Sequence, residues 1–479
     1  YLLANGKKSR MRAASSYRIA PLFSKNEKDV SVSTKNKDEL LNRTIREIIT
    51  CNDSVAAVVT TFWDSLYVFR YLNLEDNQWL NGGEDAAEGL SATRKKVTEN
   101  LTTRLKVLRK INEIKQFPTD TSAFVNYLKD YGMEPEQFIL EALTNHKIVI
   151  YGETHRREIS WQLMKSLINT PSFSKITGTI FMELSSDKQD ALDQFFSNRE
   201  LDPEIILTIF REFQLDGWYD KGSYEFLISL WKLNKQLPEK DKIKVIATDI
   251  PMPLSTLITK EDYQHFTHNK KDRNEQMADM IEQALKLSPD KRHSLFIVGK
   301  GHACKSPAIA TEGEAGSRNS KTPPKHSAGY QLTERFSNKD VFSILSHSPG
   351  VNGKIRGGMF DYAFSCAGNK PLAFQLAGSP FGKEVFDGFF GIAYKEETGS
   401  FENNYDGYVF LGPLADEKAE YILYELVTDD FAHELIRRAI LSGTENEKWF
   451  GVENKNLTKD AIISGLKKSA GNNKRWEGL

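Results

Sequence analysis

From residue 147 onward, short runs of apolar residues alternate with longer amphipathic stretches. The apolar runs have the length of strands and cover residues 147–152, 178–184, 243–250 and 293–302. The stretches near and between them carry apolar residues at helical spacing and cover residues 157–168, 186–196, 223–236 and 273–287. Continuous apolar strands separated by helices are typical of a parallel sheet whose two faces are covered. The pattern therefore predicts the α/β fold class, with a mainly parallel central sheet flanked by helices.

We expect this α/β domain to span residues 146–415. Three further strands are predicted at residues 340–347, 371–377 and 405–412. Residues 305–328 are small, polar and rich in Pro and Gly, which is typical either of a surface loop or of a mobile lid. Residues 416–479 are predicted to form a helical C-terminal tail that packs on the domain.

The N-terminal part shows a different pattern of apolar and polar residues. Residues 1–37 show no hydrophobic period, which predicts a flexible arm. Residues 38–145 are predicted to form a helical N-terminal subdomain, because apolar residues recur there at spacings of three and four. The residues that carry this period are Ile45, Ile48, Ile49, Leu101, Leu105 and Leu108.

Composition and charge narrow the classes of function. The chain of 479 residues is 39% hydrophobic and has a formal net charge of −1, which argues against a nucleic-acid partner. Its three cysteines are too few for a disulfide framework. No apolar run approaches the roughly 20 residues that span a bilayer. We therefore expect a soluble protein. The chain begins at Tyr1, which leaves the compartment open: secreted, periplasmic and lipid-anchored are the alternatives if a signal has been removed.

Two turns of the form Gly-x-x-His follow predicted strands, at Gly152–His155 and Gly299–His302. The glycine is expected to permit a tight or left-handed turn, and Glu153 stands beside the first histidine. Either turn alone is more often a helix cap than a site. Because parallel strands end at one edge of a sheet, however, the two imidazoles are expected to converge.

Glu183 and Asp249 also follow apolar strands, so five ionisable side chains are predicted to share one polar site. Two histidines with carboxylates suit Zn or Mn, with His155, His302, Glu183 and Glu153 as ligands. The same set suits metal-free acid–base hydrolysis, and the sequence leaves the choice open. The P-loop, GxGxxG and GxSxG motifs are absent from the sequence. Cys304 is interpreted as a small buried residue rather than a nucleophile.

These segments, in this order, resemble the haem-binding-uptake/Tiki superfamily, with ChaN-like proteins as the most similar branch. The matching segments are YGETHRREISWQLMKSL, FMELSSDKQDALDQFF, WYDKGSYEFLISLWKLNKQ with IKVIATDIP, GKGHA and YDGYVFLGP. The ChaN-like pattern corresponds to Glu153 and His155, Glu183 with Gln189 and Asp193, His302, and Asp406. The resemblance covers roughly residues 145–415.

The resemblance implies different functions in different branches. Tiki-like members are metal-dependent proteases, erythromycin-esterase-like members hydrolyse an ester, and ChaN-like members bind haem. The esterase branch carries GExxH, whereas this chain has GETH. The leading hypothesis is a hydrolase of an ester or amide bond in a small-molecule or peptide substrate. His155 would be general base or metal ligand, His302 the second ligand or the acid, and Asp249 would play a supporting role. The alternatives are a haem-binding protein of ChaN type and a toxin or effector module.

Overall fold

A computed structural model describes most of the chain from residue 121 onward. The described residues are 121–307, 326–350, 355–386, 388–389, 392–393, 399–417 and 422–471, together with short strands at residues 2–4, 7–9, 44–50, 55–62, 66–73 and 79–80.

A seven-stranded sheet forms the centre of the α/β domain, in the order β12-β15-β11-β7-β10-β8-β9. All neighbouring pairs are parallel except β12 and β15, which run antiparallel at one edge. The strands are β7 (Ile148–Glu153), β8 (Thr177–Ser185), β9 (Lys244–Asp249), β10 (His293–Gly299), β11 (Val341–Ser346), β12 (Leu372–Gln375) and β15 (Gly407–Phe410). The predicted fold class, a mainly parallel sheet flanked by helices, is confirmed.

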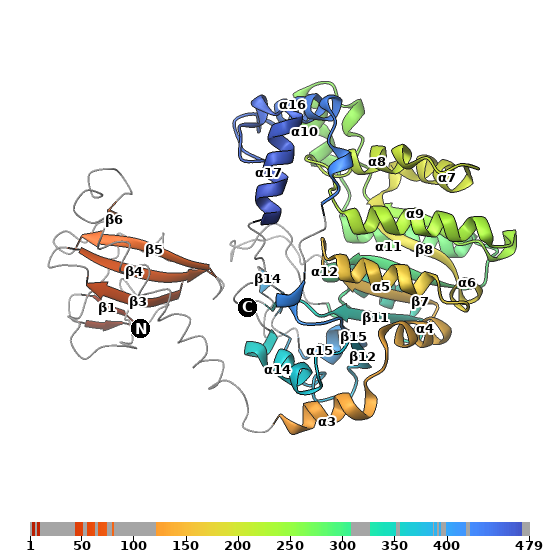
Figure 1. The fold of residues 1–479 in the computed structure, drawn as a ribbon, viewed down its shortest axis with the longest axis horizontal. Helices are drawn as coiled ribbons and strands as arrows, with labels where there is room; N and C mark the ends of the chain where they lie inside the picture. The colour runs from red at the N-terminus through yellow and green to blue at the C-terminus, as the bar shows by residue number, and fades with distance from the viewer. Residues whose placement is uncertain are drawn as a thin grey trace.

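Helices cover both faces of this sheet (Figure 1). Val149 and Tyr151 of β7 face one apolar core, and Ile148 and Ile150 face the other, as alternation along a strand requires. The first core is closed by α4 (Pro135–Asn145), α5 (Glu158–Ile168), α7 (Gln189–Ser197), α8 (Pro203–Arg211) and α9 (Lys221–Gln236). The second is closed by α3 (Ser122–Tyr131), α11 (Arg273–Leu287), α13 (Ala328–Phe336) and α14 (Met359–Cys366).

The strand order brings three strand ends together. After β7, β8 and β9, the chain returns and inserts β10 between β7 and β8. Gly299 at the end of β10 pairs with Glu153 at the end of β7. The two Gly-x-x-His turns therefore leave neighbouring strands at the same edge of the sheet, beside Glu183 of β8. In open α/β sheets such an edge is where ligands bind.

The helical prediction for residues 38–145 is wrong over its first part. Residues 44–80 contain an antiparallel sheet of β3 (Thr44–Thr50), β4 (Val55–Phe62), β5 (Leu66–Asn73) and β6 (Trp79–Leu80). These segments are rich in β-branched and aromatic residues, which favour strands and outweigh the helix-like spacing of three isoleucines. In the described part of the chain, the first helix is α3, and Leu101, Leu105 and Leu108 lie outside the described residues.

Two other expectations change at the ends of the chain. Within the predicted flexible arm, β1 (Leu2–Ala4) and β2 (Lys7–Ser9) pair as a short hairpin. In the predicted helical tail, Ile422 forms an isolated bridge with Asp220, and Tyr424–Leu426 form a 3-10 turn after it. The tail is helical at α16 (Asp429–Ser442) and α17 (Lys459–Gly471), and α16 contacts α10 (Lys260–Asn269). Within the described ranges, no helix is long and apolar enough to cross a membrane.

Candidate functional site

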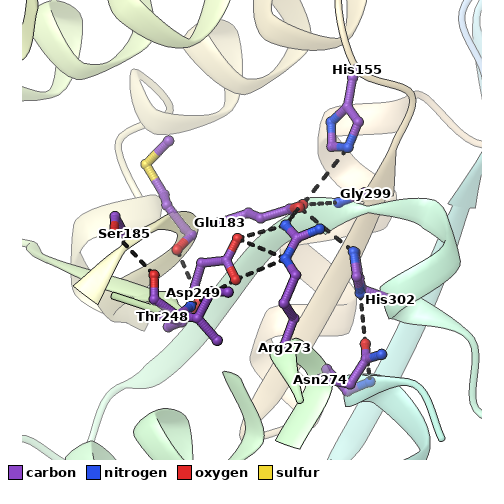
Figure 2. A network of polar contacts seen from close by, with 12 residues as sticks. His155, Glu183, Ser185, Thr248, Asp249, Arg273, Asn274, Gly299 and His302 are labelled. Atoms are coloured by element: carbon purple, nitrogen blue, oxygen red, sulfur yellow. Dashed lines mark hydrogen bonds and ion pairs between the residues drawn. The ribbon is translucent and has the colours of Figure 1, made fainter. Parts of the chain in front are cut away.

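Among the predicted site residues near Glu183, His155 has the most exposed side chain. Its side chain is 39% exposed, whereas those of Glu153, Glu183 and His302 are 6%, 10% and 6% exposed. Its Nδ1 hydrogen-bonds to Glu153 Oε1, and since a carboxylate accepts, Nδ1 carries the proton. Nε2 lies 3.9 Å from Glu183 Oε2 (Figure 2). The atom of His155 that is not held by Glu153 therefore faces a second carboxylate at more than hydrogen-bond distance.

The carboxylate of Glu183 lies at the centre of the site and is approached by several of its polar groups (Figure 2). Its Oε2 accepts a hydrogen bond of 2.9 Å from the backbone N–H of Gly299. Its Oε1 accepts one of 2.6 Å from Arg273 and lies 3.6 Å from His302 Nε2. The structure thus brings both predicted histidines to the two oxygens of one carboxylate.

Arg273 joins Glu183 to Asp249. Its Nε lies 3.0 Å from Asp249 Oδ1, and its Nη2 lies 2.5 Å from Asp249 Oδ2. Asp249 is fully buried. A forked guanidinium on a buried carboxylate is a rigid arrangement, so Asp249 fixes the cation that in turn holds Glu183. The supporting role of Asp249 stays a prediction, and its connection to Glu183 runs through Arg273, a residue that the sequence analysis did not name.

His302 is held from behind by Asn274. Its Nδ1 lies 2.6 Å from Asn274 Oδ1, which also accepts the backbone N–H of Ala328 at 3.1 Å. Asn274 Oδ1 is therefore an acceptor, and His302 Nδ1 carries the proton. The ring belongs to the short helix α12 (Lys300–Ala303) and is buried.

The two glycines are required by close packing rather than by a left-handed backbone. A Cβ on Gly299 would lie 2.8 Å from His155 Cε1, and one on Gly152 would lie 2.9 Å from the Cβ of Ala303. Neither glycine has positive φ; the left-handed residue of the first turn is Arg156, with φ of 64°. Of the two alternatives expected for Gly152, a tight or a left-handed turn, the left-handed one is therefore wrong.

Charges around the site shift its protonation. Burial lowers the pKa of His155, but the carboxylates of Glu153 and Glu183 outweigh it and raise the pKa to about 9. Burial raises the pKa of Glu183, and the opposing charges of His302, His155 and Arg273 bring it down to about 2. His155 is consequently an imidazolium at neutral pH, paired with ionised Glu183.

Asp220 is a further buried carboxylate beside this turn. It caps α9 by accepting the Ser223 N–H at 3.2 Å, and its other oxygen accepts the indole N–H of Trp161 at 3.2 Å. The same oxygen lies 3.4 Å from the backbone nitrogen of Arg156. Burial and the charge of Glu153 raise the pKa of Asp220 to about 6. Asp220 therefore supports the backbone that presents His155.

A metal ion does not suit this set of side chains. A divalent cation at Glu183 would compete with Arg273, which already neutralises Glu183 and Asp249. It would also add a second positive charge beside that guanidinium. Within the described ranges, no group of three or more His, Cys, Asp or Glu side chains has the geometry to hold a metal. Zn or Mn as a cofactor stays a prediction that the geometry does not favour.

Other residues named from the sequence have structural roles. Cys304 is buried, its thiol donates to Asn404 Oδ1 at 3.1 Å, and burial raises its pKa to about 11, so a thiolate is disfavoured. Gln189 bonds the backbone of β9 as well as Asp193, and these contacts fasten α7 to the sheet. Asp406 accepts from Lys305 and from the N–H of Ser343. Most of the predicted lid, residues 308–325, lies outside the described residues.

Arg273, Asn274 and Asp220 were missed by the sequence analysis. One signal for Arg273 is its position at the first residue of α11, where a cation opposes the helix dipole and needs an anionic partner. Asp220 precedes the helical stretch of the WYDKGSYEF segment and is a recognisable N-cap. Asn274 offered no comparable signal, because its partners His302 and Ala328 are distant in the sequence.

No family model and no curated protein matches the chain. Several solved structures are similar to it. A succinoglycan biosynthesis protein aligns with a TM-score of 0.45 and 11% identity, over 62% of this chain and 98% of its own. A histidine-to-asparagine mutant of the erythromycin esterase EreC, in its open conformation, aligns with a TM-score of 0.41 and 11% identity, over 57% and 92%. ChaN of Campylobacter jejuni, with cofacially bound haem, aligns with a TM-score of 0.28 and 14% identity, over 46% and 90%. Similarity at this level is a distant relationship of fold.

Proposed function

We propose that the chain hydrolyses an ester or amide bond, with His155 as the general base and no resident metal ion. The observation that carries the proposal is the placement of His155. Its ring is held at Nδ1 by Glu153, it is partly exposed, and Nε2 faces Glu183 across 3.9 Å. A partly exposed histidine that a carboxylate orients at one ring nitrogen is the arrangement used for proton transfer.

In the proposed reaction, each residue around His155 has a separate role. The neutral imidazole, which is the major form above the pKa of about 9 and a minor form at pH 7, takes a proton from water at Nε2 while the water oxygen bonds to the substrate carbonyl carbon. The bond from that carbon to the alcohol oxygen or amine nitrogen then breaks, and the imidazolium returns its proton to the departing atom. Glu153 and Glu183 stabilise the imidazolium, because both are close carboxylates. Arg273 and Asp249 keep Glu183 in place, and Asn274 keeps His302 beside it. His302 is buried and serves as a positioning residue in this scheme.

The order of the motifs supports placing the chain in the haem-binding-uptake/Tiki superfamily, and an erythromycin esterase and a ChaN protein are among the similar structures. Haem binding and an effector role stay predictions, and no contact in the described part of the chain favours either over hydrolysis.

The proposal is tested by screening a panel of aryl and alkyl esters and anilides with wild-type protein and His155→Gln, both dialysed against a chelator. We expect turnover of at least one class by the wild type and a loss of about 100-fold or more in the variant. His433→Gln, at an exposed position on α16, is the matched control and should keep full activity. Equal turnover by His155→Gln and wild type would refute the role of His155. Loss of wild-type activity on chelation, restored by Zn or Mn, would refute the metal-free scheme.

A further inference from the structure

A cavity of about 310 Å³ lies away from the polar site. It is lined by residues of α3 and α4, by Phe342 near the start of β11 and by Gln375 at the end of the antiparallel strand β12. These positions belong to the amino-terminal end of the parallel strands, whereas His155 follows the carboxyl-terminal end of β7. In Figure 1, α3, α4 and β12 lie together at the lower part of the α/β domain. The cavity is therefore separate from the proposed catalytic centre.

Five of the ten residues that line this cavity carry aromatic rings. Tyr127 and Tyr131 lie about one turn apart on α3, and their ring centroids are 4.8 Å apart. The other wall has Phe342 with Phe138 and His146, whose ring centroids lie 6.0 and 4.8 Å from that of Phe342. The hydroxyl of Tyr127 donates to the carbonyl of Gln375 at 2.9 Å, so this ring is fixed in place.

The charged residues in the lining favour a cationic ligand over an anionic one. Among the residues that line the cavity there is one carboxylate, Glu141, and no lysine or arginine. His146 Nδ1 lies 2.8 Å from the carbonyl oxygen of Lys339, so Nδ1 is a donor whose hydrogen bond is already used. Tyr131 is 62% exposed, so its side chain is accessible to a ligand.

We propose that this cavity binds a small methylated ammonium cation of the choline type. Aromatic rings attract a cation through their negative faces, and a nearby carboxylate adds to the attraction. Methyl groups on the nitrogen suit the apolar parts of the lining, and they reduce the cost of removing the cation from water. A volume of about 310 Å³ is at the lower end of ligand pockets, which fits a ligand of this size.

The test compares choline with dimethylbutanol, its uncharged isostere in which carbon replaces nitrogen, by calorimetry and ligand-observed NMR on the full chain. We expect choline to bind at least about fivefold more tightly than the isostere, since a cation–π contact contributes about 1 kcal/mol. Equal affinity for the two probes would mean an apolar pocket and would overturn the proposal. Binding of neither probe would overturn it as well.

Two variants localise the binding. Tyr131→Ala should weaken choline binding about fivefold or more, and Glu141→Gln should weaken it by a smaller factor. Both positions are exposed, so these variants should fold. Tyr362→Ala, at a tyrosine that is 46% exposed on α14, is the control and should bind as wild type does. His155→Gln should also bind choline normally, so the result does not depend on the proposed hydrolase activity. Unchanged binding in Tyr131→Ala would place the cation elsewhere and contradict the proposal.

Discussion

The contact between Gly299 and His155 leaves no room for a side chain. A Cβ at residue 299 would meet two ring atoms of His155 at 2.8 Å, whereas one on Gly301, two residues later, would meet nothing within 4 Å. The same short segment therefore contains a glycine that positions the imidazole and a glycine that does not. This difference gives a controlled test of how strictly the ring must be placed.

Gly299→Ala should lower ester hydrolysis by about 10- to 100-fold, because a displaced imidazole loses alignment with water and substrate. Gly301→Ala should keep activity within about twofold and should not destabilise α12, since alanine favours helix. Steady-state kinetics and thermal unfolding of both variants check the prediction. Equal effects of the two substitutions would mean that the His155 contact is unimportant.

Asp220 makes stability depend on pH. Its pKa is about 6 in the fold and 3.8 ordinarily, so between these values the folded chain keeps a proton that the unfolded chain has released. The contribution of Asp220 to the free energy of unfolding is therefore highest below pH 4 and falls as pH rises through 6. Asp220→Asn removes this fall and retains a good N-cap for α9.

Urea unfolding of wild type and Asp220→Asn at several pH values from 4 to 7 measures the effect. We expect the stability of wild type relative to the variant to decrease across this range. Asp202→Asn makes the same exchange at the exposed N-cap of α8 and provides the matched control, in which the decrease measured against Asp220→Asn should persist. Parallel curves for Asp220→Asn would show that Asp220 titrates normally.

At the scale of elements, a buried ion pair fastens the first Gly-x-x-His turn to the segment after β15. The side chain of Arg157, at the N-cap of α5, is 1% exposed and bonds Glu417 through two of its nitrogens. It also donates to the carbonyl of His347, which follows β11. One side chain thus ties together the ends of three strands beside the site.

Glu417→Gln should destabilise the fold by about 3 kcal/mol, because it leaves the buried guanidinium of Arg157 without its counter-ion. Glu239→Gln breaks a pair whose glutamate side chain is 87% exposed and should cost less than about 0.5 kcal/mol. Chemical denaturation of both variants gives the comparison. A cost for Glu417→Gln as small as that of the surface variant would mean that this pair does not hold the turn.

The strands of the α/β domain were predictable because each is a continuous apolar run bounded by polar residues. β7, β8, β9 and β10 all lie within or next to their predicted ranges. The strands at residues 44–80 were not predicted, because isolated isoleucines at spacings of three and four fit a helix face as well as a strand. Only the pairing of β4 with β3 and with β5 decides between the two, and pairing is not encoded in the spacing within one segment.

At the scale of the whole molecule, the site is a product of topology. His155, Glu183 and His302 come from strand ends separated by 28 to 147 positions, so only the order β7-β10-β8 brings them together. The convergence was predictable from the rule that parallel strands end at one edge. The network behind it was not, since Arg273 and Asn274 enter from a helix that the rule does not place.

The pH dependence of kcat/KM for ester hydrolysis tests the central claim most directly, in wild type and in Glu153→Gln. If His155 is the base, its neutral form is required, and its pKa of about 9 makes the rate rise about tenfold per pH unit from 6 to 8 before levelling near 9. Glu153→Gln removes the nearest carboxylate, so the levelling should shift to lower pH, while Glu239→Gln should leave it in place. A rate that falls with rising pH over this range, or a midpoint that Glu153→Gln does not move, would contradict the assignment of His155 as a base held by Glu153.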